Sequence, residues 1–348
     1  MNSLKKNTRF ILDKSDVDAF LVTKSVNIAY LTGFPSEDAW FLISPKRLFY
    51  ITDARYTLEV KKNLKSGIEI VEYSKSMFST VLDLALQLKI KRLGFDEKHI
   101  SVSSFQKLRK AMKRKVKLVS VGGLIEQLRM IKTGQEVRKI DKAIVLNLKC
   151  YQYLKRIIRP GMTEQEILVK LERYVKRHNA EFSFRPIIAS GPNSCFPHAR
   201  ITTRKVRRGE PIVIDMGIDI DGYKSDLTRV FFLGKIPQSI GDVYRLVREA
   251  QRVAIQKIKP GVLISEVDQQ ARNFLKENKI DKFFVHSLGH GIGLEVHEVP
   301  VISLKNSSKL QEGMVFTVEP GVYFPGQFGI RVEDMVLVTS RGCKVLSK

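Results

Sequence analysis

The sequence predicts two domains, an α/β domain followed by an α+β domain. Its length of 348 residues suits two domains of ordinary size. In residues 1–125, short apolar strands alternate with helical patterns, as in an α/β fold. In residues 126–348, one order of elements occurs twice. This faint repeat predicts two related halves that close around a shared site.

The first domain is expected to contain one mixed sheet. A tight Ser-Pro-Lys-Arg turn at residues 44–47 joins two strands directly, whereas helices separate the other strands. The domain has no strong catalytic motif, and its one histidine, His99, is expected to be an exposed polar residue. Strands are predicted at residues 17–22, 39–43, 48–51, 68–71, 92–95 and 117–119, and helices at 55–64, 77–88 and 102–112.

The order that repeats in the second domain is a long helix, a Pro-Gly pair, another helix and then strands. In the first copy the second helix opens at Thr163, and Glu166 gives the spacing of a capping box. In the second copy the corresponding helix opens at Ser265. The long helices are predicted at residues 135–158 and 239–258, and the strands near 211–233 and 314–338.

An Asp-Gly pair at residues 221–222 predicts a two-residue hairpin turn between alternating apolar runs. The register that follows pairs Asp215 with Thr228 and Gly217 with Asp226. Because side chains alternate along a strand, Asp215 and Asp226 then share one face as diagonal neighbours. Gly217 is expected to leave space for metal ions beside Asp226.

Three further residues place charge in or beside apolar strands. Glu319 ends an apolar strand and is followed by proline, and Arg331 and Glu333 share one face of another strand. A buried acid is costly unless it is paired or bound to metal. These positions are therefore candidates for a site rather than for a solvated surface.

The second domain carries five potential metal ligands, each inside its own short motif. Four carboxylates and one imidazole are enough to hold two ions that share a water, as in a two-metal hydrolase whose bridging hydroxide attacks the substrate. The HExxH motif is absent, which argues against a thermolysin-type zinc peptidase. The candidate ligands are Asp215, Asp226, His290, Glu319 and Glu333.

The chain is strongly basic, with 60 Lys and Arg against 36 Asp and Glu and a formal net charge of +24. Clustered cations bind phosphate backbones, and residues 107–117 and 200–208 are such stretches. Neither stretch interleaves aromatic residues for base stacking. We interpret the charge as a solvated face and do not expect a nucleic-acid partner.

Cysteine usage indicates a cytoplasmic protein. Cys150, Cys195 and Cys343 are odd in number and lack CxxC spacing, which fits a reduced compartment and neither a disulfide framework nor a zinc ribbon. The first residues lack the apolar core of a signal peptide, and no later segment predicts a membrane span. We therefore expect no membrane partner.

The segments GHGIGLEVHE, TVEPG, GIRVED, VIDMG and SDLTR resemble those of the creatinase/methionine-aminopeptidase ("pita-bread") metallopeptidase family. The likeness covers nearly the whole chain. It implies a creatinase-like α/β domain at residues 1–125 and a pita-bread α+β catalytic domain with pseudo-twofold halves at 126–348. Three features resemble the Xaa-Pro peptidases, aminopeptidase P and prolidase: GPNS followed by Pro197-His198, Arg331 before the last ligand, and an amino-terminal domain with YLTGF and TDARY.

This resemblance implies a metal-dependent exopeptidase that hydrolyses Xaa-Pro bonds in peptides or dipeptides with a hydroxide that bridges two divalent ions. Asp226 and Glu333 would bridge both ions. Asp215 would bind one ion, and His290 with Glu319 the other. The mixture of ligands favours manganese first, with cobalt, iron or zinc as alternatives.

The resemblance also implies roles around the metals. Glu319 is similar to the residue proposed as the family's proton shuttle, and His297 would stabilise the tetrahedral oxyanion. His198 would contact substrate near the scissile bond. Arg331, beside Glu333, would hold that ligand and orient a substrate group by bidentate contact. His286 would form a wall of the site or support it.

Several alternatives stay open at this point. A non-catalytic pita-bread binding protein, for nucleic acid or another partner, is one, but the five ligand positions are intact. A methionine aminopeptidase is another, disfavoured by Arg331 and by the amino-terminal domain. No motif separates a dipeptidase from an aminopeptidase P. A homodimer is expected from the resemblance alone.

Overall fold

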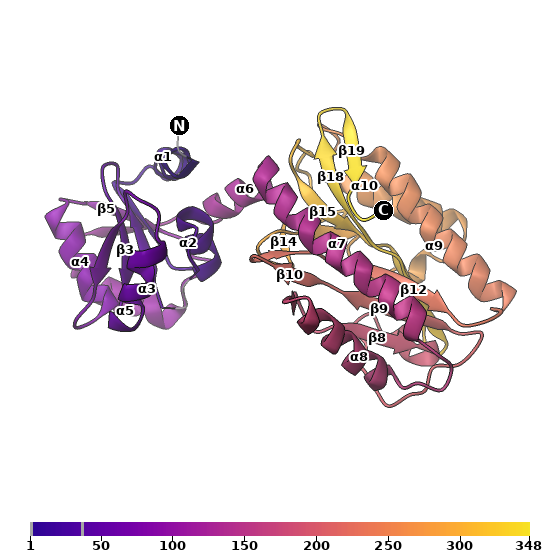
Figure 1. Ribbon diagram of the computed structural model, residues 1–348. Coiled ribbons are helices and arrows are strands. Elements are labelled where there is room, and N and C mark those ends of the chain that lie inside the picture. Colours follow the sequence, from indigo (N-terminus) through magenta and orange to yellow (C-terminus); the bar gives the residue numbers. More distant parts are fainter. Residues whose placement is uncertain (1–2, 36–37) are drawn as a thin grey trace. The chain divides into compact units, whose positions relative to one another are not determined.

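The computed structural model describes residues 3–35 and 38–348. Contacts divide the chain into two compact units, Met1–Arg129 and Met130–Lys348, which are described separately (Figure 1). The boundary expected at residues 125–126 lies inside helix α6 (Leu124–Met130).

The first unit is built on a six-stranded mixed sheet in the order β4-β3-β2-β1-β5-β6. β1, β2 and β3 are antiparallel neighbours, whereas the pairs β1–β5, β5–β6 and β3–β4 are parallel, so the predicted mixed sheet is confirmed. The strands are β1 (Ala19–Val22), β2 (Trp40–Ile43), β3 (Leu48–Thr52), β4 (Glu69–Glu72), β5 (Arg92–Phe95) and β6 (Lys117–Ser120).

Helices cover both faces of this sheet, because its central strands are apolar throughout. In β1, Phe20 and Val22 enter one core cluster while Ala19 and Leu21 enter another. A strand that is buried on both faces cannot alternate apolar with polar residues. Besides α6, the helices are α1 (Ser3–Ser15), α2 (Ser25–Thr32), α3 (Ala54–Asn63), α4 (Met77–Gln87) and α5 (Val102–Met112), of which α1 and α2 were not predicted.

The second unit repeats two helices and then strands, as the sequence predicts. The first half contains α7 (Gly134–Ile157), α8 (Glu164–Arg177), β7 (Glu181–Phe182), β8 (Ile187–Ser190), η1 (Gly191–Cys195), β9 (Pro211–Met216), β10 (Ile218–Ile220), β11 (Tyr223–Lys224) and β12 (Leu227–Phe232). The second half contains α9 (Gln238–Lys257), α10 (Ile264–Glu277), η2 (Asp281–Phe283), β13 (Gly289–Gly291), β14 (Glu298–Ile302), β15 (Val315–Val318), β16 (Gly321–Phe324), β17 (Phe328–Arg331), β18 (Asp334–Thr339) and β19 (Gly342–Val345).

Local signals explain where these helices begin. The Thr163 side chain accepts from the Glu166 N–H while the Glu166 carboxylate accepts from the Thr163 N–H, so the predicted capping box opens α8. Thr133 opens α7 in the same way. The helix expected from Ser265 begins instead at Ile264, after an N-cap residue whose side chain makes no capping bond.

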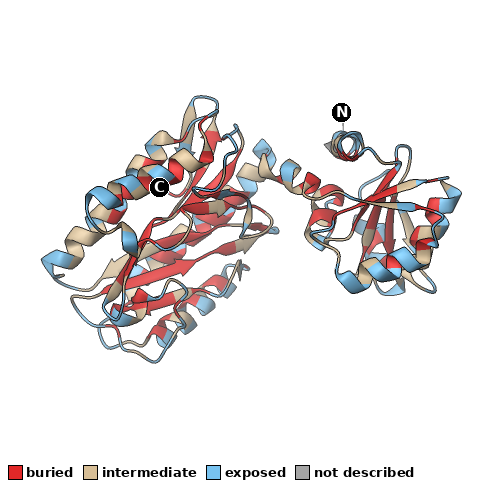
Figure 2. Cartoon of the chain, turned by 180° about the vertical axis from the view of Figure 1, so that it is seen from behind, coloured by how far each residue is buried: buried red, intermediate tan, exposed pale blue. Residues whose placement is uncertain are grey.

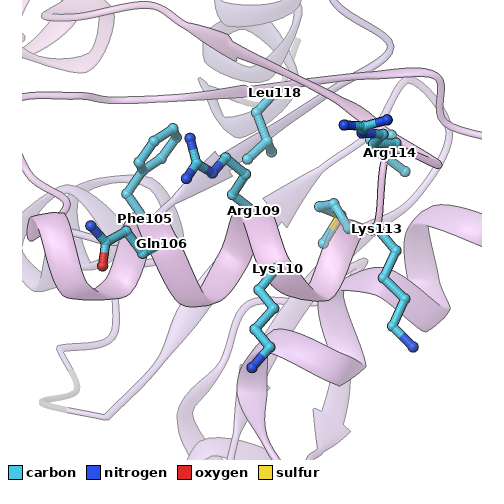
Figure 3. A pocket seen from close by; sticks show the side chains of 9 residues that line it. Phe105, Gln106, Arg109, Lys110, Lys113, Arg114 and Leu118 are labelled. Atoms are coloured by element: carbon cyan, nitrogen blue, oxygen red, sulfur yellow. The ribbon is translucent and has the colours of Figure 1, made fainter.

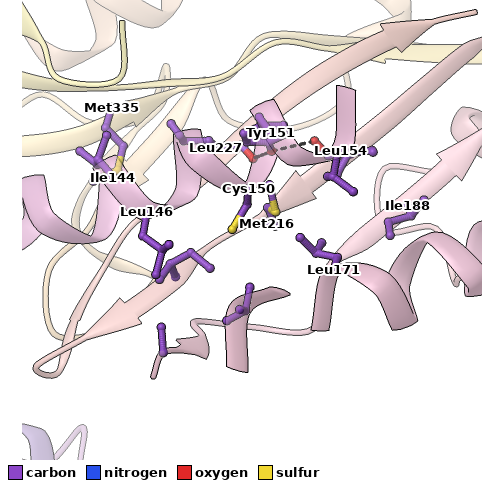
Figure 4. Close-up of a cluster of buried hydrophobic side chains, with 14 of the residues drawn as sticks. Ile144, Leu146, Cys150, Tyr151, Leu154, Leu171, Ile188, Met216, Leu227 and Met335 are labelled. Carbon is purple, nitrogen blue, oxygen red and sulfur yellow. Dashed lines mark hydrogen bonds between the residues drawn. The ribbon is translucent and has the colours of Figure 1, made fainter. Parts of the chain in front are cut away.

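Two apolar core clusters lie mainly in the first and in the second half, and the first also takes in Val315 and Met335 of the second half. Buried residues concentrate in the strands (Figure 2). In the first half, α7 packs Cys150, Tyr151 and Leu154 toward the sheet β12-β9-β8 (Figure 4). The Tyr151 hydroxyl lies 3.0 Å from the Ile214 carbonyl oxygen and 2.5 Å from that of Leu227. The tyrosine therefore ties α7 to β9 and β12 at once.

Replacing this hydroxyl tests how much the tie contributes. Tyr151→Phe is expected to lower the free energy of unfolding of the second unit by about 1–2 kcal/mol, because it leaves buried carbonyl acceptors without their donor. Urea denaturation followed by circular dichroism measures the change. Tyr153→Phe on the same helix is the matched control and should change stability by less than about 0.5 kcal/mol. Equal effects of the two substitutions would contradict the assignment.

Candidate metal centre

The first hairpin of the second unit delivers two predicted ligands, Asp215 and Asp226. β9 and β12 pair Asp215 with Thr228, and β10 and β11 pair Ile220 with Tyr223. The two turn residues between β10 and β11 have φ angles of 55° and 78°, which suit a type I′ turn. The predicted hairpin register is therefore confirmed.

The hairpin is interrupted beside Asp226, between β9 and β10, at Gly217. A Cβ atom on Gly217 would lie 2.2 Å from the Ser225 carbonyl oxygen and 2.8 Å from the Phe184 ring. The expectation that Gly217 leaves space for metal ions is wrong, because neighbouring protein atoms fill the place that its side chain would take. The glycine instead permits a close passage of the chain beside the ligand.

His290, in β13, presents an unprotonated nitrogen to two carboxylates. Its Nδ1 donates to the Gly291 carbonyl oxygen at 3.1 Å, so Nε2 carries the lone pair. Nε2 lies 3.6 Å from Asp226 Oδ2 and 3.4 Å from Glu319 Oε1. Burial, assisted by the charge of His297, lowers the pKa of His290 to about 4. Three acceptors thus face one another, an arrangement that suits a shared cation.

The other two acids lie just after strands of the second half. Thr228 Oγ1 donates to Glu333 Oε2 at 2.8 Å, and the Glu333 N–H donates to the Thr228 carbonyl oxygen at 3.2 Å. The Glu319 N–H donates to the Leu288 carbonyl oxygen, and Thr317 Oγ1 donates to Glu319 Oε1 at 3.1 Å. These bonds fix both carboxylates toward the first hairpin.

All five predicted ligands converge. Single ligand atoms of Asp226, His290 and Glu333 lie within 4.8 Å of one another. Glu319 Oε1 lies 3.4 Å from His290 Nε2. Asp215 is linked to Glu333 through Arg331 and Thr228, because Arg331 donates to Asp215 and to Thr228, and Thr228 donates to Glu333. The structure therefore brings together ligands that are separated by more than a hundred residues of sequence.

The charge of this cluster is only partly compensated within the protein, by the ion pair between Arg331 and Asp215. Asp215 Oδ1, Asp226 Oδ1 and Glu333 Oε1 are buried acceptors without a hydrogen-bond partner. Burial, and then repulsion among the carboxylates, raises the pKa of Asp226 and of Glu333 well above the usual range. Burial raises the pKa of Glu319 to about 7. Orphaned carboxylate oxygens around a neutral imidazole fit divalent cations, so the residues present suit the predicted metal ions.

Three predicted histidines surround the cluster at different depths. His297 is exposed at one side, its ring lies 4.3 Å from that of His290, and partial desolvation lowers the pKa of His297. His198 is exposed, and its charge further lowers the pKa of His297 and of His286. His286 is the most buried of the three, and this burial lowers its pKa to about 4. The three side chains therefore border one region beside the carboxylates.

Arg331 is buried and contacts a different ligand from the one expected. Its Nη2 donates to Asp215 Oδ2 at 2.6 Å, and its Nε donates to Thr228 Oγ1 at 3.1 Å. Its Nη1 donates to the Tyr323 hydroxyl at 2.6 Å and to the Pro197 carbonyl oxygen at 3.1 Å. The predicted hold on the adjacent glutamate is wrong, because β17 directs the guanidinium toward β9. With four of its five N–H donors occupied by protein, the side chain is fixed in place.

Sequence reasoning missed Tyr323. His286 Nδ1 donates to the Ser287 carbonyl oxygen, so His286 Nε2 accepts from the Tyr323 hydroxyl at 3.1 Å. That hydroxyl in turn accepts from Arg331. The β16–β17 register pairs Gly321 with Arg331, which makes Tyr323 a diagonal neighbour of the arginine. Counting this hairpin outward from its Pro-Gly-Gln loop is the signal that could have found it.

A second group of ligand-type side chains lies in the first unit. Single atoms of Asp96, His99 and Glu126 lie within 4.8 Å of one another. His99 Nε2 is 2.8 Å from Glu126 Oε1, and Lys24 Nζ is 3.9 Å from the same oxygen. The expectation of an exposed His99 is wrong, because this side chain is only 21% exposed. Lys24 already faces Glu126, whereas no ion pair with Lys or Arg is found for Asp226 or Glu333 among the described residues.

The basic stretch at residues 107–117 lines an open cavity of about 750 Å³ between α5 and β6 (Figure 3). Phe105 and Leu118 contribute apolar walls. Its cations form no ion pair within the described part of the chain, and they are Arg109, Lys110, Lys113 and Arg114. This cavity belongs to the first unit alone and shares no residue with the candidate metal centre.

Two family models match the chain. The model of metallopeptidase family M24 matches residues 138–340, and that of the creatinase/prolidase N-terminal domain matches residues 5–131. The predicted fold class, a creatinase-like domain before a metallopeptidase domain, is thereby confirmed. Over the residues described, no helix is long and apolar enough to cross a membrane.

Individual relatives are similar over nearly their whole length. The chain is 34% identical to a Xaa-Pro dipeptidase of Pyrococcus horikoshii, with 100% of this chain and 97% of the relative covered. Among solved structures, a Xaa-Pro dipeptidase from Bacillus anthracis has a TM-score of 0.95 at 33% identity, covering 99% and 97% of the two chains. An X-Pro aminopeptidase from Thermotoga maritima has a TM-score of 0.90 at 36% identity, covering 98% and 97%.

Removing one carboxylate tests the metal centre directly. Asp226→Asn is expected to lower bound metal by at least about tenfold, because it takes a charged ligand from the middle of the cluster. Asp219→Asn is the matched control in the same hairpin, since Asp219 pairs with Lys224 instead. Elemental analysis after dialysis measures the metal. Unchanged metal content in Asp226→Asn would refute the role of this residue.

The raised carboxyl pKa values predict that metal binding releases protons. Metal-free Glu319, with a pKa of about 7, is increasingly protonated as pH falls below 7, and a protonated carboxyl is a poor ligand. Metal affinity should therefore fall as pH is lowered from about 8 to about 6. Titration calorimetry in buffers of different ionisation enthalpy counts the protons. Equal affinity at both pH values without proton release would contradict this account.

Proposed function

Because the chain belongs to metallopeptidase family M24, we propose that it is a metal-dependent exopeptidase that hydrolyses the bond before proline in dipeptides or at the amino terminus of peptides. One observation carries the proposal most. Asp215, Asp226 and Glu333 each have a buried carboxylate oxygen without a partner, and Asp226 and Glu333 lie beside the neutral imidazole of His290, a donor set that suits a dinuclear hydrolase. Relatives named Xaa-Pro dipeptidase and X-Pro aminopeptidase support the choice of substrate.

We propose that two divalent ions are held by the five clustered residues. Asp226 and Glu333 would be shared by both ions, as the resemblance implies, and their positions beside His290, each with one unpartnered buried oxygen, support this role. Asp215 would bind one ion, and His290 with Glu319 the other. When bound, the ions supply Lewis acidity and lower the pKa of a water molecule. Manganese is proposed first, since carboxylates outnumber the single imidazole.

The protein's own residues would position the substrate and move its protons. Glu319 can accept a proton from the attacking water and pass it to the leaving nitrogen, while Thr317 holds one of its oxygens. Neutral His297 can donate a hydrogen bond to the developing oxyanion. Exposed His198 would contact the substrate, and His286 would support the site through Tyr323. Arg331 would hold Asp215 in orientation rather than bind Glu333.

The length of the substrate stays open between two classes. Relatives named dipeptidase and relatives named aminopeptidase both match nearly the whole chain at similar sequence identity. Proline offers no N–H donor, so its subsite must recognise the ring by shape. Turnover of Ala-Pro against Ala-Pro-Ala decides between the two classes.

We further propose a cytoplasmic homodimer. The free cysteines Cys150, Cys195 and Cys343 support a reducing compartment. Light scattering on the purified protein tests the oligomeric state.

The relatives described above are named Xaa-Pro dipeptidase and X-Pro aminopeptidase. These names support neither a nucleic-acid-binding role nor methionine aminopeptidase activity.

Activity should depend on metal in a reversible way. A chelator is expected to reduce Xaa-Pro hydrolysis at least about a hundredfold, because the orphaned carboxylates then repel one another and no Lewis acid remains. Added manganese should restore turnover. Release of proline measured by amino-acid analysis follows the reaction, and Ala-Ala serves as the control substrate. Failure of the metal-loaded protein to cleave any Xaa-Pro substrate would refute the proposed function.

A further inference from the structure

Glu164, the first residue of α8, is a fully buried acid that the proposed chemistry does not use. Its Oε1 accepts from the N–H of Ser190 at 2.8 Å and from the Ser190 hydroxyl at 2.9 Å. Its Oε2 accepts from Asn193 Nδ2 at 2.9 Å, and from the N–H and hydroxyl of Thr202 at 2.9 and 2.7 Å. Five donors therefore meet on one side chain.

This environment is matched to a carboxylate side chain. All five partners donate, and the two oxygens of Glu164 accept all five bonds. A buried charge is costly unless it is compensated, and here the amino-terminal end of α8 contributes positive potential. Arg204 lies next to the cluster, since its Nη1 donates to the Ser190 hydroxyl at 2.6 Å while the same guanidinium pairs with Glu210.

The partners of Glu164 mark the ends of one loop. Ser190 ends β8, Asn193 lies in η1, and Thr202 comes after the loop. Asn193 Nδ2 also donates to the Arg200 carbonyl oxygen at 3.0 Å, which closes the loop a second time. Residues 191–201 are thus held at both ends by contacts that converge on a single carboxylate.

The same loop reaches the candidate metal centre. The Pro197 carbonyl oxygen accepts from Arg331 Nη1, and Arg331 Nη2 holds Asp215. Ser194 Oγ accepts from the Gly329 N–H at 2.9 Å, which fixes the loop against β17. His198, next in sequence to the proline, has no regular secondary structure of its own to orient it.

We propose that Glu164 is a positioning residue for substrate, because it holds the 191–201 loop so that His198 faces the substrate beside the metal centre. That the loop binds substrate rests on the proposed function. That Glu164 holds the loop rests on the hydrogen bonds alone. Loss of the Glu164 carboxylate should therefore weaken substrate binding while the metal ligands keep their places.

The test compares Glu164→Gln with Glu166→Gln. The first variant keeps the size of the side chain but turns an acceptor into a donor that faces other donors. The second changes a nearby exposed carboxylate of the same helical turn, which serves only the capping box. Glu164→Gln is expected to raise KM for a Xaa-Pro dipeptide at least about tenfold, with kcat changed less than about threefold and metal content unchanged. Glu166→Gln should leave KM within about twofold.

A second readout does not depend on activity. Hydrogen–deuterium exchange at residues 191–201 should be at least about tenfold faster in Glu164→Gln than in wild type, and unchanged in Glu166→Gln. Should Glu164→Gln be insoluble, Thr202→Val provides the test, because it removes one donor to the Glu164 carboxylate. This variant should also raise KM and increase the rate of hydrogen–deuterium exchange in the loop.

The outcomes separate this inference from the proposed function. Faster exchange in a protein whose wild type cleaves no Xaa-Pro substrate would support the anchoring of the loop while it refutes the proposed function. A wild-type enzyme that is active, with KM and loop exchange unchanged by Glu164→Gln, would overturn the positioning role. Loss of metal, or a fall in kcat alone, would also overturn it, because the residue would then act on the metal centre.

Discussion

The mutual repulsion of buried carboxylates is the constraint on which the second unit depends. Asp226 and Glu333 lie close together, buried, each with an oxygen that nothing in the protein satisfies. Such an arrangement destabilises a folded chain unless a cation neutralises it. Neutral His290 supplies an acceptor rather than that cation, and Arg331 compensates only one side through Asp215. The unit is therefore incomplete without divalent metal.

The repeated architecture makes this concentration of charge possible. Two apolar core clusters, one mainly in each half, pack the strands that meet between the halves. Ligands come from a hairpin of the first half and from strand ends of the second, and Thr228 joins the two through its contacts with Glu333. Hydrogen bonds from Thr317 and Thr228 orient Glu319 and Glu333, and ligands that are held in this way favour metal binding. Hydrogen bonds to Glu164 hold the loop that carries His198 in a similar way.

Local rules predicted the fold and the convergence of the candidate ligands, and failed where contacting residues are distant in sequence. The Asp-Gly turn set a register that could be counted, which placed Asp215 and Asp226 correctly. Apolar runs located every strand of the first sheet, but α1 and α2 were overlooked. The partner of Arg331 could not be predicted, because the approach of β17 to β9 depends on packing between halves. Tyr323 was within reach of a register count.

Metal stoichiometry tests the central claim most directly. Purified protein should be stripped of metal, loaded with excess manganese, freed of unbound ions and measured by elemental mass spectrometry against protein concentration. The account predicts about two manganese ions per chain, because five ligands with orphaned carboxylate oxygens suit a dinuclear centre. A loaded protein that retains neither manganese nor any other divalent ion would contradict the account.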